Sequence, residues 1–248
     1  MLTDTEGIVL RQVKTSYNRK MILLFSKKYG KISAGTSIGE KGRSKSSLAL
    51  KPFTYGRYEL FKSRESYNIN SAEAIKSYYK IGENVDKYMN GAYVLEFTEK
   101  ILAEGVQSAG MFNLLLDFFS VLENRDRGIG SLVLAYQTKA FKYAGVMPSL
   151  DKCTICGEKK EPAVFSVEEG GIICKDCWQN LQNSQTHTLI YDAKFGIVGI
   201  LKYFSENSLV NLANLALREE TGKMLQKLIR EYAAYYLDAV DLKSEKLV

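Results

Sequence analysis

Four cysteines are the residues of this sequence whose type and spacing predict chemistry most directly. They form two CxxC pairs, Cys153 with Cys156 and Cys174 with Cys177, which are separated by seventeen residues, and the chain holds no other cysteine. Paired motifs at this spacing are typical of a zinc ion held by four thiolates. Gly157, directly after the first pair, allows the tight turn that a zinc knuckle needs. Two disulfides, two redox-active pairs or an iron–sulfur cluster are the alternatives, and the spacing favours zinc over each of them.

The predicted metal is structural, because four thiolate ligands leave no coordination position at which zinc could activate water. The first six residues, MLTDTE, hold no basic segment followed by an apolar one, so no secretory signal is expected. The thiols are therefore expected in a reducing cytoplasm. No membrane span is expected either, because no window of about eighteen uninterrupted apolar residues occurs.

Motifs of known catalytic sites do not add a second centre. The GxxxxGK[ST] spacing of a nucleotide-binding loop does not occur, and the single histidine, His187, has no cysteine or serine elbow near it in the sequence. Most acidic residues stand at helical spacing among cations, which is typical of solvated helix faces. The sequence therefore predicts a protein that is not an enzyme.

Positive charge is concentrated in the first third of the chain. Residues 1–80 hold sixteen Lys and Arg against six Asp and Glu, a net charge of +10. The remaining residues hold eighteen against twenty-two, a net charge of −4, and the two values add up to the +6 of the whole chain. A basic region joined to a slightly acidic body predicts that the N-terminal part binds a polyanion.

Aromatic side chains alternate with these cations, and this combination is typical of surfaces that bind single-stranded nucleic acid. Cations would neutralise phosphates and aromatic faces would stack on bases, although about half of the aromatics should fill the interior of a small barrel. The candidate DNA-binding residues are Arg11, Lys14, Tyr17, Arg19, Lys20, Lys31, Lys41, Arg43, Lys45, Lys51, Tyr55, Arg57, Tyr58 and Lys62. The same region also contains Lys27, Lys28, Tyr29, Phe53, Arg64 and Tyr67.

Five short strands are predicted to position these side chains, at residues 7–10, 21–25, 32–34, 53–61 and 67–69. Five strands in about seventy residues favour a small closed barrel of the OB type, with an SH3-like barrel as the alternative. Residues 35–47 (GTSIGEKGRSKSS) form a predicted flexible loop whose amides and cations could bind phosphate. A loop of this composition alone would be interpreted as a solvated surface loop. The many cations in the neighbouring strands favour phosphate binding instead.

Helical periodicity begins near residue 83 and predicts helices over about 85–102, 112–122 and 131–144, then a last long helix over about 218–240. The cysteine segment interrupts them, with a short hairpin over residues 163–173. We therefore predict an α+β protein. It has an OB-fold DNA-binding domain over residues 1–80 and an α-helical bundle domain over residues 81–248, into which a zinc-binding segment, residues 150–180, is inserted.

This order of parts resembles the RecO family of bacterial recombination mediators. Local similarity lies in residues 6–11 (EGIVLR), 29–31 (YGK), 51–53 (KPF) and 58–60 (YEL) of the barrel. It continues in residues 143–148 (YAGVMP), before the first cysteine pair, and in residues 165–171 (FSVEEGG), before the second. The opening strand and the cysteine segment are the more specific pieces.

The resemblance implies functions that composition and spacing do not. It implies binding of single- and double-stranded DNA and annealing of complementary strands without catalysis. It also implies partnership with RecR and with the C-terminal tail of single-stranded DNA-binding protein, in loading RecA onto coated DNA. The protein would then act in the cytoplasm, in association with the nucleoid.

Two other classes of function remain as alternatives. One is a zinc-dependent enzyme that acts on nucleic acid, for instance a nuclease. The other is a protein-interaction scaffold whose basic domain binds acidic partners. The lack of a histidine or carboxylate cluster beside the cysteines in the sequence argues against the enzyme.

Overall fold

The computed structural model describes residues 1–14, 20–38, 45–64, 66–182, 188–193 and 196–244. Contacts between Cα atoms divide this part of the chain into two compact units. The first comprises Met1–Asn124 with a C-terminal segment that starts at Leu242, and the second comprises Arg125–Asp241. No helix within these described ranges combines the length and the apolar character needed to cross a membrane.

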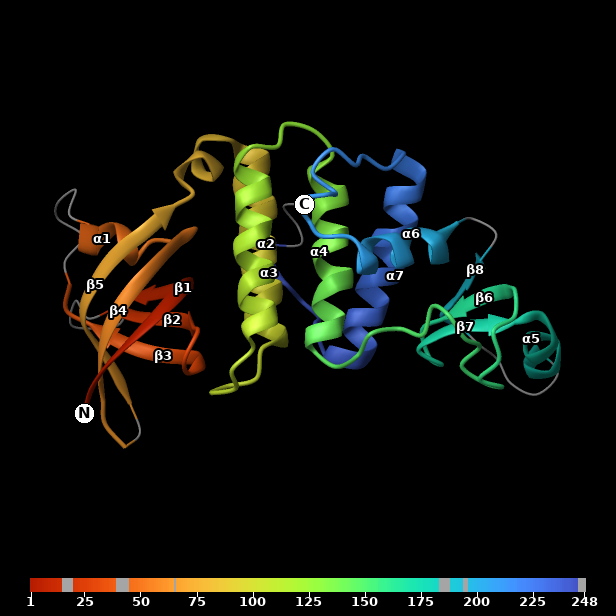
Figure 1. Ribbon diagram of the computed structural model, residues 1–248, viewed down its shortest axis with the longest axis horizontal. Coiled ribbons are helices and arrows are strands. Elements are labelled where there is room, and N and C mark those ends of the chain that lie inside the picture. Colours follow the sequence, from red (N-terminus) through yellow and green to blue (C-terminus); the bar gives the residue numbers. More distant parts are fainter. Residues whose placement is uncertain (15–19, 39–44, 65, 183–187, 194–195, 245–248) are drawn as a thin grey trace. The chain divides into compact units, whose positions relative to one another are not determined.

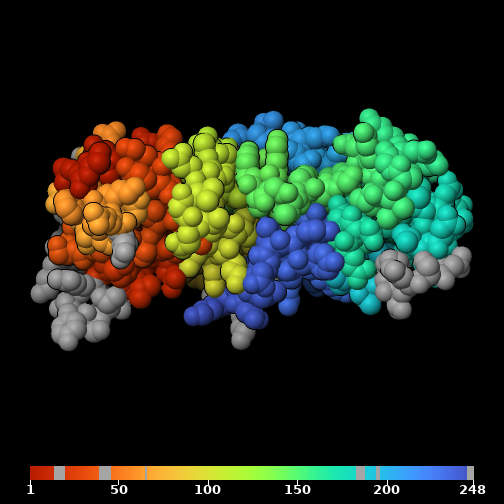
Figure 2. All heavy atoms as spheres, turned by 90° about the horizontal axis from the view of Figure 1, so that it is seen from below, coloured from red at the N-terminus to blue at the C-terminus, as the bar shows by residue number. Residues whose placement is uncertain are grey.

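The first unit begins with five strands that close into a barrel (Figure 1). They are β1 (Leu2–Lys14), β2 (Lys20–Ser26), β3 (Gly30–Thr36), β4 (Thr54–Lys62) and β5 (Tyr67–Ser77). Their order around the barrel is β1-β2-β3-β5-β4, with β1 antiparallel to both of its neighbours and β3 parallel to β5. The predicted OB-fold barrel is confirmed. In Figure 2 its strands form one continuous surface of red and orange atoms.

Strand β1 is much longer than predicted because it serves two neighbours. Its first half pairs with β4, from Leu2 to Ile8, and its second half pairs with β2, from Gly7 to Lys14. The register with β2 shifts between Val9 and Arg11. Such a bulge bends and twists a strand, which lets β1 turn from one partner to the other and close the barrel.

The barrel core follows from the alternation of side chains along each strand. In β4, for example, Tyr58 and Leu60 are buried whereas Arg57 and Phe61 are exposed. The core side chains are Val9, Ile22, Leu24, Ile32, Ala34, Ala49, Leu50, Tyr58, Leu60, Ile69 and Ala72. Large side chains fill the interior, so the cationic side chains are left to the outside and the ends.

The connection between β3 and β4 differs from the predicted loop over residues 35–47. Residues 35 and 36 belong to β3, and a short helix, α1 (Lys45–Ala49), precedes β4. Ala49 and the adjacent Leu50 enter the barrel core, and this apolar burial favours the helix. Residues 39–44 lie outside the described part of the chain. Within the barrel, α1 lies at one end and the N-terminus at the other (Figure 1).

Two helices belong to the same compact unit as the barrel, α2 (Val85–Ile101) and α3 (Ala109–Glu123), after the 3-10 turn η1 (Tyr79–Glu83). Phe112 of α3 packs edge-on against Phe25, with ring centroids 5.3 Å apart, and Phe119 packs against Phe53 at 5.6 Å. Gly30 approaches the backbone of Val106 so closely that a Cβ would lie 2.2 Å from its carbonyl oxygen. The contact-defined unit therefore extends past residue 80.

The second unit combines helices with a small sheet. Its elements are α4 (Ile129–Tyr143), β6 (Pro162–Ser166), β7 (Gly171–Cys174), α5 (Lys175–Gln182), β8 (Ile190–Asp192), α6 (Ile197–Glu206) and α7 (Glu219–Leu237). The sheet has the order β7-β6-β8. Strands β6 and β7 form the predicted hairpin that carries the second cysteine pair. Strand β8 was not predicted, because three residues are too short for a periodic pattern.

Cationic side chains bond to backbone carbonyls in this unit. The buried guanidinium of Arg125 donates hydrogen bonds to the carbonyls of residues 127, 128, 212, 213 and 215. The Lys139 ammonium donates to the carbonyls of Phe204, Ser205 and Asn207, at the C-terminus of α6. The last carbonyls of a helix have no partner within it, so a cation at this end stabilises α6.

Candidate metal centre and nucleic-acid interface

The four cysteines converge on one point in the second unit. Cys153 and Cys156 lie in the turn before β6, Cys174 ends β7, and Cys177 lies in the first turn of α5. Their sulfur atoms all lie within 4.8 Å of one another, and the Sγ atoms of Cys156 and Cys174 are 4.0 Å apart. Thiolates around a tetrahedral zinc ion lie about 3.8 Å apart, given a Zn–S distance of about 2.3 Å. The donor set therefore fits such a metal ion.

Backbone hydrogen bonds hold the first knuckle against the second. Gly157 has a positive φ of 74°, as predicted for the turn, and its N–H donates to the Cys153 carbonyl over 2.9 Å. Thr154 N–H donates to the carbonyl of Ile172 in β7, also over 2.9 Å. Cys174 N–H donates to the Cys153 sulfur over 3.4 Å. Backbone hydrogen bonds to the hairpin are thus sufficient to bring the two cysteine pairs together.

The protonation of the thiols agrees with a site for a dication. Burial disfavours the Cys153 thiolate, but hydrogen bonds from the amides of Cys156, Cys174 and Ile155 outweigh it and lower the pKa to about 6. The hydrogen bond with Cys174 raises the pKa of Cys177 to about 12. Four adjacent thiols cannot all lose their protons by themselves, because the negative charges of the thiolates repel one another. A bound dication would offset this repulsion and allow all four to ionise.

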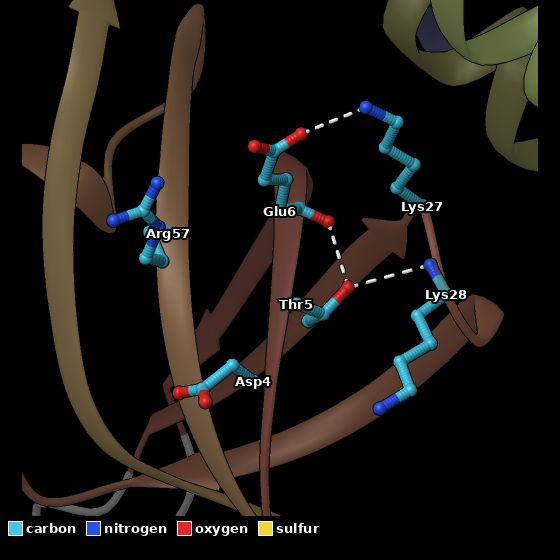
Figure 3. Close-up of a pocket in the computed structure, with 6 residues that line it drawn as sticks. All are labelled: Asp4, Thr5, Glu6, Lys27, Lys28 and Arg57. Carbon is cyan, nitrogen blue, oxygen red and sulfur yellow. Dashed lines mark hydrogen bonds and ion pairs between the residues drawn. The ribbon is translucent and has the colours of Figure 1, made fainter.

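The barrel carries a shallow pocket with a volume of about 450 Å³, here called the barrel pocket. It is lined by Asp4, Thr5, Glu6, Lys27, Lys28 and Arg57, from β1, the β2–β3 turn and β4 (Figure 3). Strand register places Glu6 opposite Arg57, and the Lys27 N–H donates to the Glu6 carbonyl over 2.9 Å. Three cations and two carboxylates therefore meet on one outer strip of the barrel.

The Glu6 carboxylate of the barrel pocket is held by two charge-assisted hydrogen bonds. It accepts from the Tyr55 hydroxyl over 2.7 Å and from the Lys27 ammonium over 2.9 Å. These two bonds and the charge of Arg57 lower the pKa of Glu6. Burial and the same carboxylate raise the pKa of Tyr55 to about 12, so its hydroxyl stays protonated as a donor.

Several predicted DNA-binding residues have structural contacts instead. Tyr58 is fully buried and its hydroxyl donates to the Ala49 carbonyl, so the prediction that it stacks on a base is wrong. Inward-facing side chains fill the interior of a small barrel, and Tyr58 is the largest of those in this core. Tyr55 is half-buried, with its ring edge-on to Phe112 at 6.0 Å and its hydroxyl on Glu6. Stacking by Tyr55 would require both contacts to break, so we do not propose it.

Two predicted cations connect β1 and β3 with α2. The Lys31 side chain is only 12% exposed, and its ammonium donates to the Glu99 carbonyl over 2.9 Å. Arg11 forms a 2.9 Å ion pair with the carboxylate of the same glutamate, although 57% of the Arg11 side chain is exposed. Lys31 is therefore corrected to a structural role, whereas Arg11 stays a candidate.

The remaining candidates divide by exposure. Lys51, Arg57 and Lys62 are exposed on the barrel, and Lys20 is half-buried in β2. Tyr17, Arg19, Lys41 and Arg43 lie outside the described residues, as do the side chains of Lys14 and Lys45. Four further residues of the predicted basic, aromatic-rich surface lie on the barrel but were not among the candidate DNA-binding residues, namely Lys27, Lys28, Tyr29 and Tyr67. The run KKYG, at residues 27–30, was the available signal, because it places two cations beside an aromatic ring in a hairpin turn.

Comparison with known proteins gives two family matches that together span most of the chain. Residues 1–78 match the family described as Recombination protein O N terminal, and residues 82–246 match Recombination protein O C terminal. All five strands of the barrel lie in the first match, and the four cysteines lie in the second.

Similar full-length proteins carry one description. The DNA repair protein RecO of Alkaliphilus metalliredigens is 28% identical over 245 residues, which cover 98% of this chain and 97% of the relative. The DNA repair protein RecO of Exiguobacterium sibiricum is 27% identical over 250 residues, which cover 100% and 96%. That of Caldanaerobacter subterraneus is 26% identical over 244 residues, which cover 97% and 95%. The chain therefore belongs to the RecO family of DNA repair and recombination proteins.

Proposed function

We propose that this protein is a recombination mediator that binds single- and double-stranded DNA and anneals complementary strands without catalysing a reaction. The observation that carries the proposal is a closed OB-fold barrel built from the region with a net charge of +10. OB-folds are frequent binders of oligonucleotides, and a cationic surface supplies the affinity for phosphate.

Annealing follows from the same charge. Two complementary strands repel each other through their phosphates, and this repulsion acts over about 10 Å at 0.1 M salt. A basic barrel that binds both strands lowers the repulsion while base pairs form. No bound nucleotide is needed for this step, because pairing itself is favourable.

The family supports a set of partners for this activity. We propose that the protein works with RecR and with the C-terminal tail of single-stranded DNA-binding protein, and that it helps to load RecA onto coated single-stranded DNA. It would act in the cytoplasm, at the nucleoid. The metal held by Cys153, Cys156, Cys174 and Cys177 is proposed to be a structural zinc ion, since four thiolates leave it no open position.

The proposal is tested by the salt dependence of single-stranded DNA binding between about 0.05 and 0.2 M salt. The wild-type affinity is expected to fall steeply. The double variant Lys51→Ala with Arg57→Ala is expected to bind more weakly and to lose about 0.7 of the log–log slope for each cation that contacts a phosphate. Both side chains are exposed, so the substitutions should leave the fold intact.

A charge-matched control is available on α7 of the second unit. Lys223 and Lys227 have side chains that are 73% and 72% exposed, and Lys223→Ala with Lys227→Ala should leave the slope unchanged. Equal losses in both double variants, or a flat salt dependence in the wild type, would contradict the proposed role of the barrel. Metal-dependent degradation of DNA would instead favour the enzyme, and partner binding without DNA binding would favour the scaffold.

A further inference from the structure

A pair of tyrosine rings lies at the end of the barrel that holds the N-terminus. Tyr29 comes from the β2–β3 turn and Tyr67 from the start of β5, and their ring centroids are 5.5 Å apart with a tilt of 45°. Both side chains pack against the barrel core, but both are only partly buried. These two rings, here called the tyrosine pair, are therefore held by the barrel core on one side and partly exposed to solvent on the other.

Hydrogen bonds fix the position of the tyrosine pair. The Tyr29 N–H donates to Ser26 Oγ over 2.9 Å, and the Tyr29 hydroxyl shares a 2.7 Å hydrogen bond with Thr3 Oγ1. The register of β4 and β5 places Tyr67 opposite Lys62. A ring held in this way loses little conformational freedom when a ligand packs on it, which favours binding.

Positive charge surrounds the two rings. The Lys62 ammonium lies 5.0 Å from the Tyr29 centroid and 5.5 Å from the Tyr67 centroid, and the Lys28 ammonium lies 5.4 Å from that of Tyr29. The N-terminal ammonium of Met1 donates to the Lys62 carbonyl over 2.9 Å. Aromatic faces beside the ammonium groups of Lys28 and Lys62 match a ligand that is flat, aromatic and anionic, as a nucleotide in a strand is.

Lys28 connects the tyrosine pair with the barrel pocket. It lines that pocket together with Lys27 and Arg57 (Figure 3). Its ammonium also lies over the Tyr29 ring, 5.4 Å from the centroid. We propose that a single strand of DNA places its phosphodiesters along Lys27, Lys28 and Arg57 and stacks one unpaired base on the tyrosine pair. This inference rests on the proposed DNA binding and identifies the place where an unpaired base is recognised.

The lysine ammoniums over the rings are replaced when the strand binds. A contact between a cation and an aromatic face at an exposed site is weaker than the stacking of a base on that face. The flexible lysine side chains then turn from the rings to the phosphates. In duplex DNA the bases are already stacked on one another, so the tyrosine pair favours single strands whereas the pocket cations serve both forms.

The test compares binding of a thymidine oligonucleotide and of a closed DNA hairpin to the full-length protein at one salt concentration. Tyr29→Leu with Tyr67→Leu is expected to lower the affinity for the single strand about tenfold and to leave that for the hairpin unchanged. Tyr29→Phe with Tyr67→Phe keeps both rings and should keep single-strand affinity. Photo-crosslinking of an oligonucleotide that carries 5-iodouracil should join the base to Tyr29 or Tyr67 in the wild-type protein.

The outcomes separate this inference from the proposed function. Equal losses for the two DNA forms, or crosslinks only outside residues 27–30 and 62–67, would overturn the stacking site while leaving DNA binding in place. No binding of either form by the wild type would overturn the proposed function itself. Crosslinking needs no substitution, so it decides the question even if the leucine variant does not fold.

Discussion

At the scale of single residues, several cations of the barrel surface form ion pairs with carboxylates of the same unit. Glu6 neutralises much of the charge that Lys27 and Arg57 bring to the barrel pocket. Glu99 similarly binds Arg11. The net charge of a region is therefore a poor guide to which of its cations can contact a phosphate, because pairing within the protein removes some of them.

Glu6 gives a prediction for the pH dependence of stability. Its pKa is lowered in the folded protein, mainly by the Tyr55 hydroxyl and then by Lys27. The carboxylate therefore stabilises the fold above its unfolded pKa of about 4.3, and this contribution is lost as pH falls through the folded pKa. Glu6→Gln should lower the free energy of unfolding by about 0.5 kcal/mol at neutral pH and make no difference near about pH 3.

Urea unfolding of both proteins across this pH range measures the effect. Asp4→Asn serves as the control, because Asp4 is an exposed carboxylate on the same strand. A difference between wild type and Glu6→Gln that stayed constant down to acid pH would show that the ionised carboxylate is not what stabilises the fold.

At the scale of elements, lysine ammonium groups stabilise helix C-termini by donating to their last backbone carbonyls. The Lys139 ammonium at the C-terminus of α6 and the Lys87 ammonium on the carbonyl of Glu123, which ends α3, are both of this kind. Neither could be predicted from periodicity, since a lysine in a helical pattern is normally assigned to the solvated face. Their carbonyl partners lie 36 or more positions away along the chain.

Lys139→Met tests this stabilisation. Methionine keeps the apolar stem but removes the ammonium, so three carbonyls lose a donor and the free energy of unfolding should fall by about 1–3 kcal/mol. The matched control is Lys142→Met, an exposed lysine one turn further along α4, which should change it by less than about 0.5 kcal/mol. Chemical denaturation reports both values, and equal effects of the two substitutions would contradict the capping role.

At the scale of the whole molecule, the candidate metal site and the proposed DNA-binding surface lie in different compact units. The four cysteines belong to the second unit, and the barrel pocket and the tyrosine pair belong to the first. The proposed zinc ion would therefore support the structure of the second unit and take no direct part in DNA binding. Stability and affinity should respond separately when the metal is lost.

Cys153→Ser tests this separation. The variant is expected to lose its metal and to melt about 5 °C or more below the wild type, because structural zinc contributes folding free energy directly. Below its melting temperature its affinity for single-stranded DNA should be unchanged. Metal analysis, thermal unfolding and DNA binding are measured together, with Ile155→Ser as an exposed control in the same knuckle. Lost annealing at an unchanged melting temperature would contradict a structural role.

Local patterns of the sequence predicted a small five-stranded barrel, the helices α2, α3, α4 and α7 and the cluster of four thiols. Alternation, helical period and CxxC spacing act over a few residues, so they can be detected without a structure. The β8 strand and the helix α1 escaped detection because each is short and is stabilised by partners distant in sequence.

Only the tertiary structure decided which side chains of the basic region face solvent. Tyr58 and Tyr29 are both tyrosines among cations in the sequence, yet the closure of the barrel buries the first completely and leaves the second partly exposed. Lys31 and Arg57 differ in the same way, since α2 holds Lys31 but not Arg57. Exposure depends on contacts between residues far apart along the chain, and composition or spacing does not contain that information.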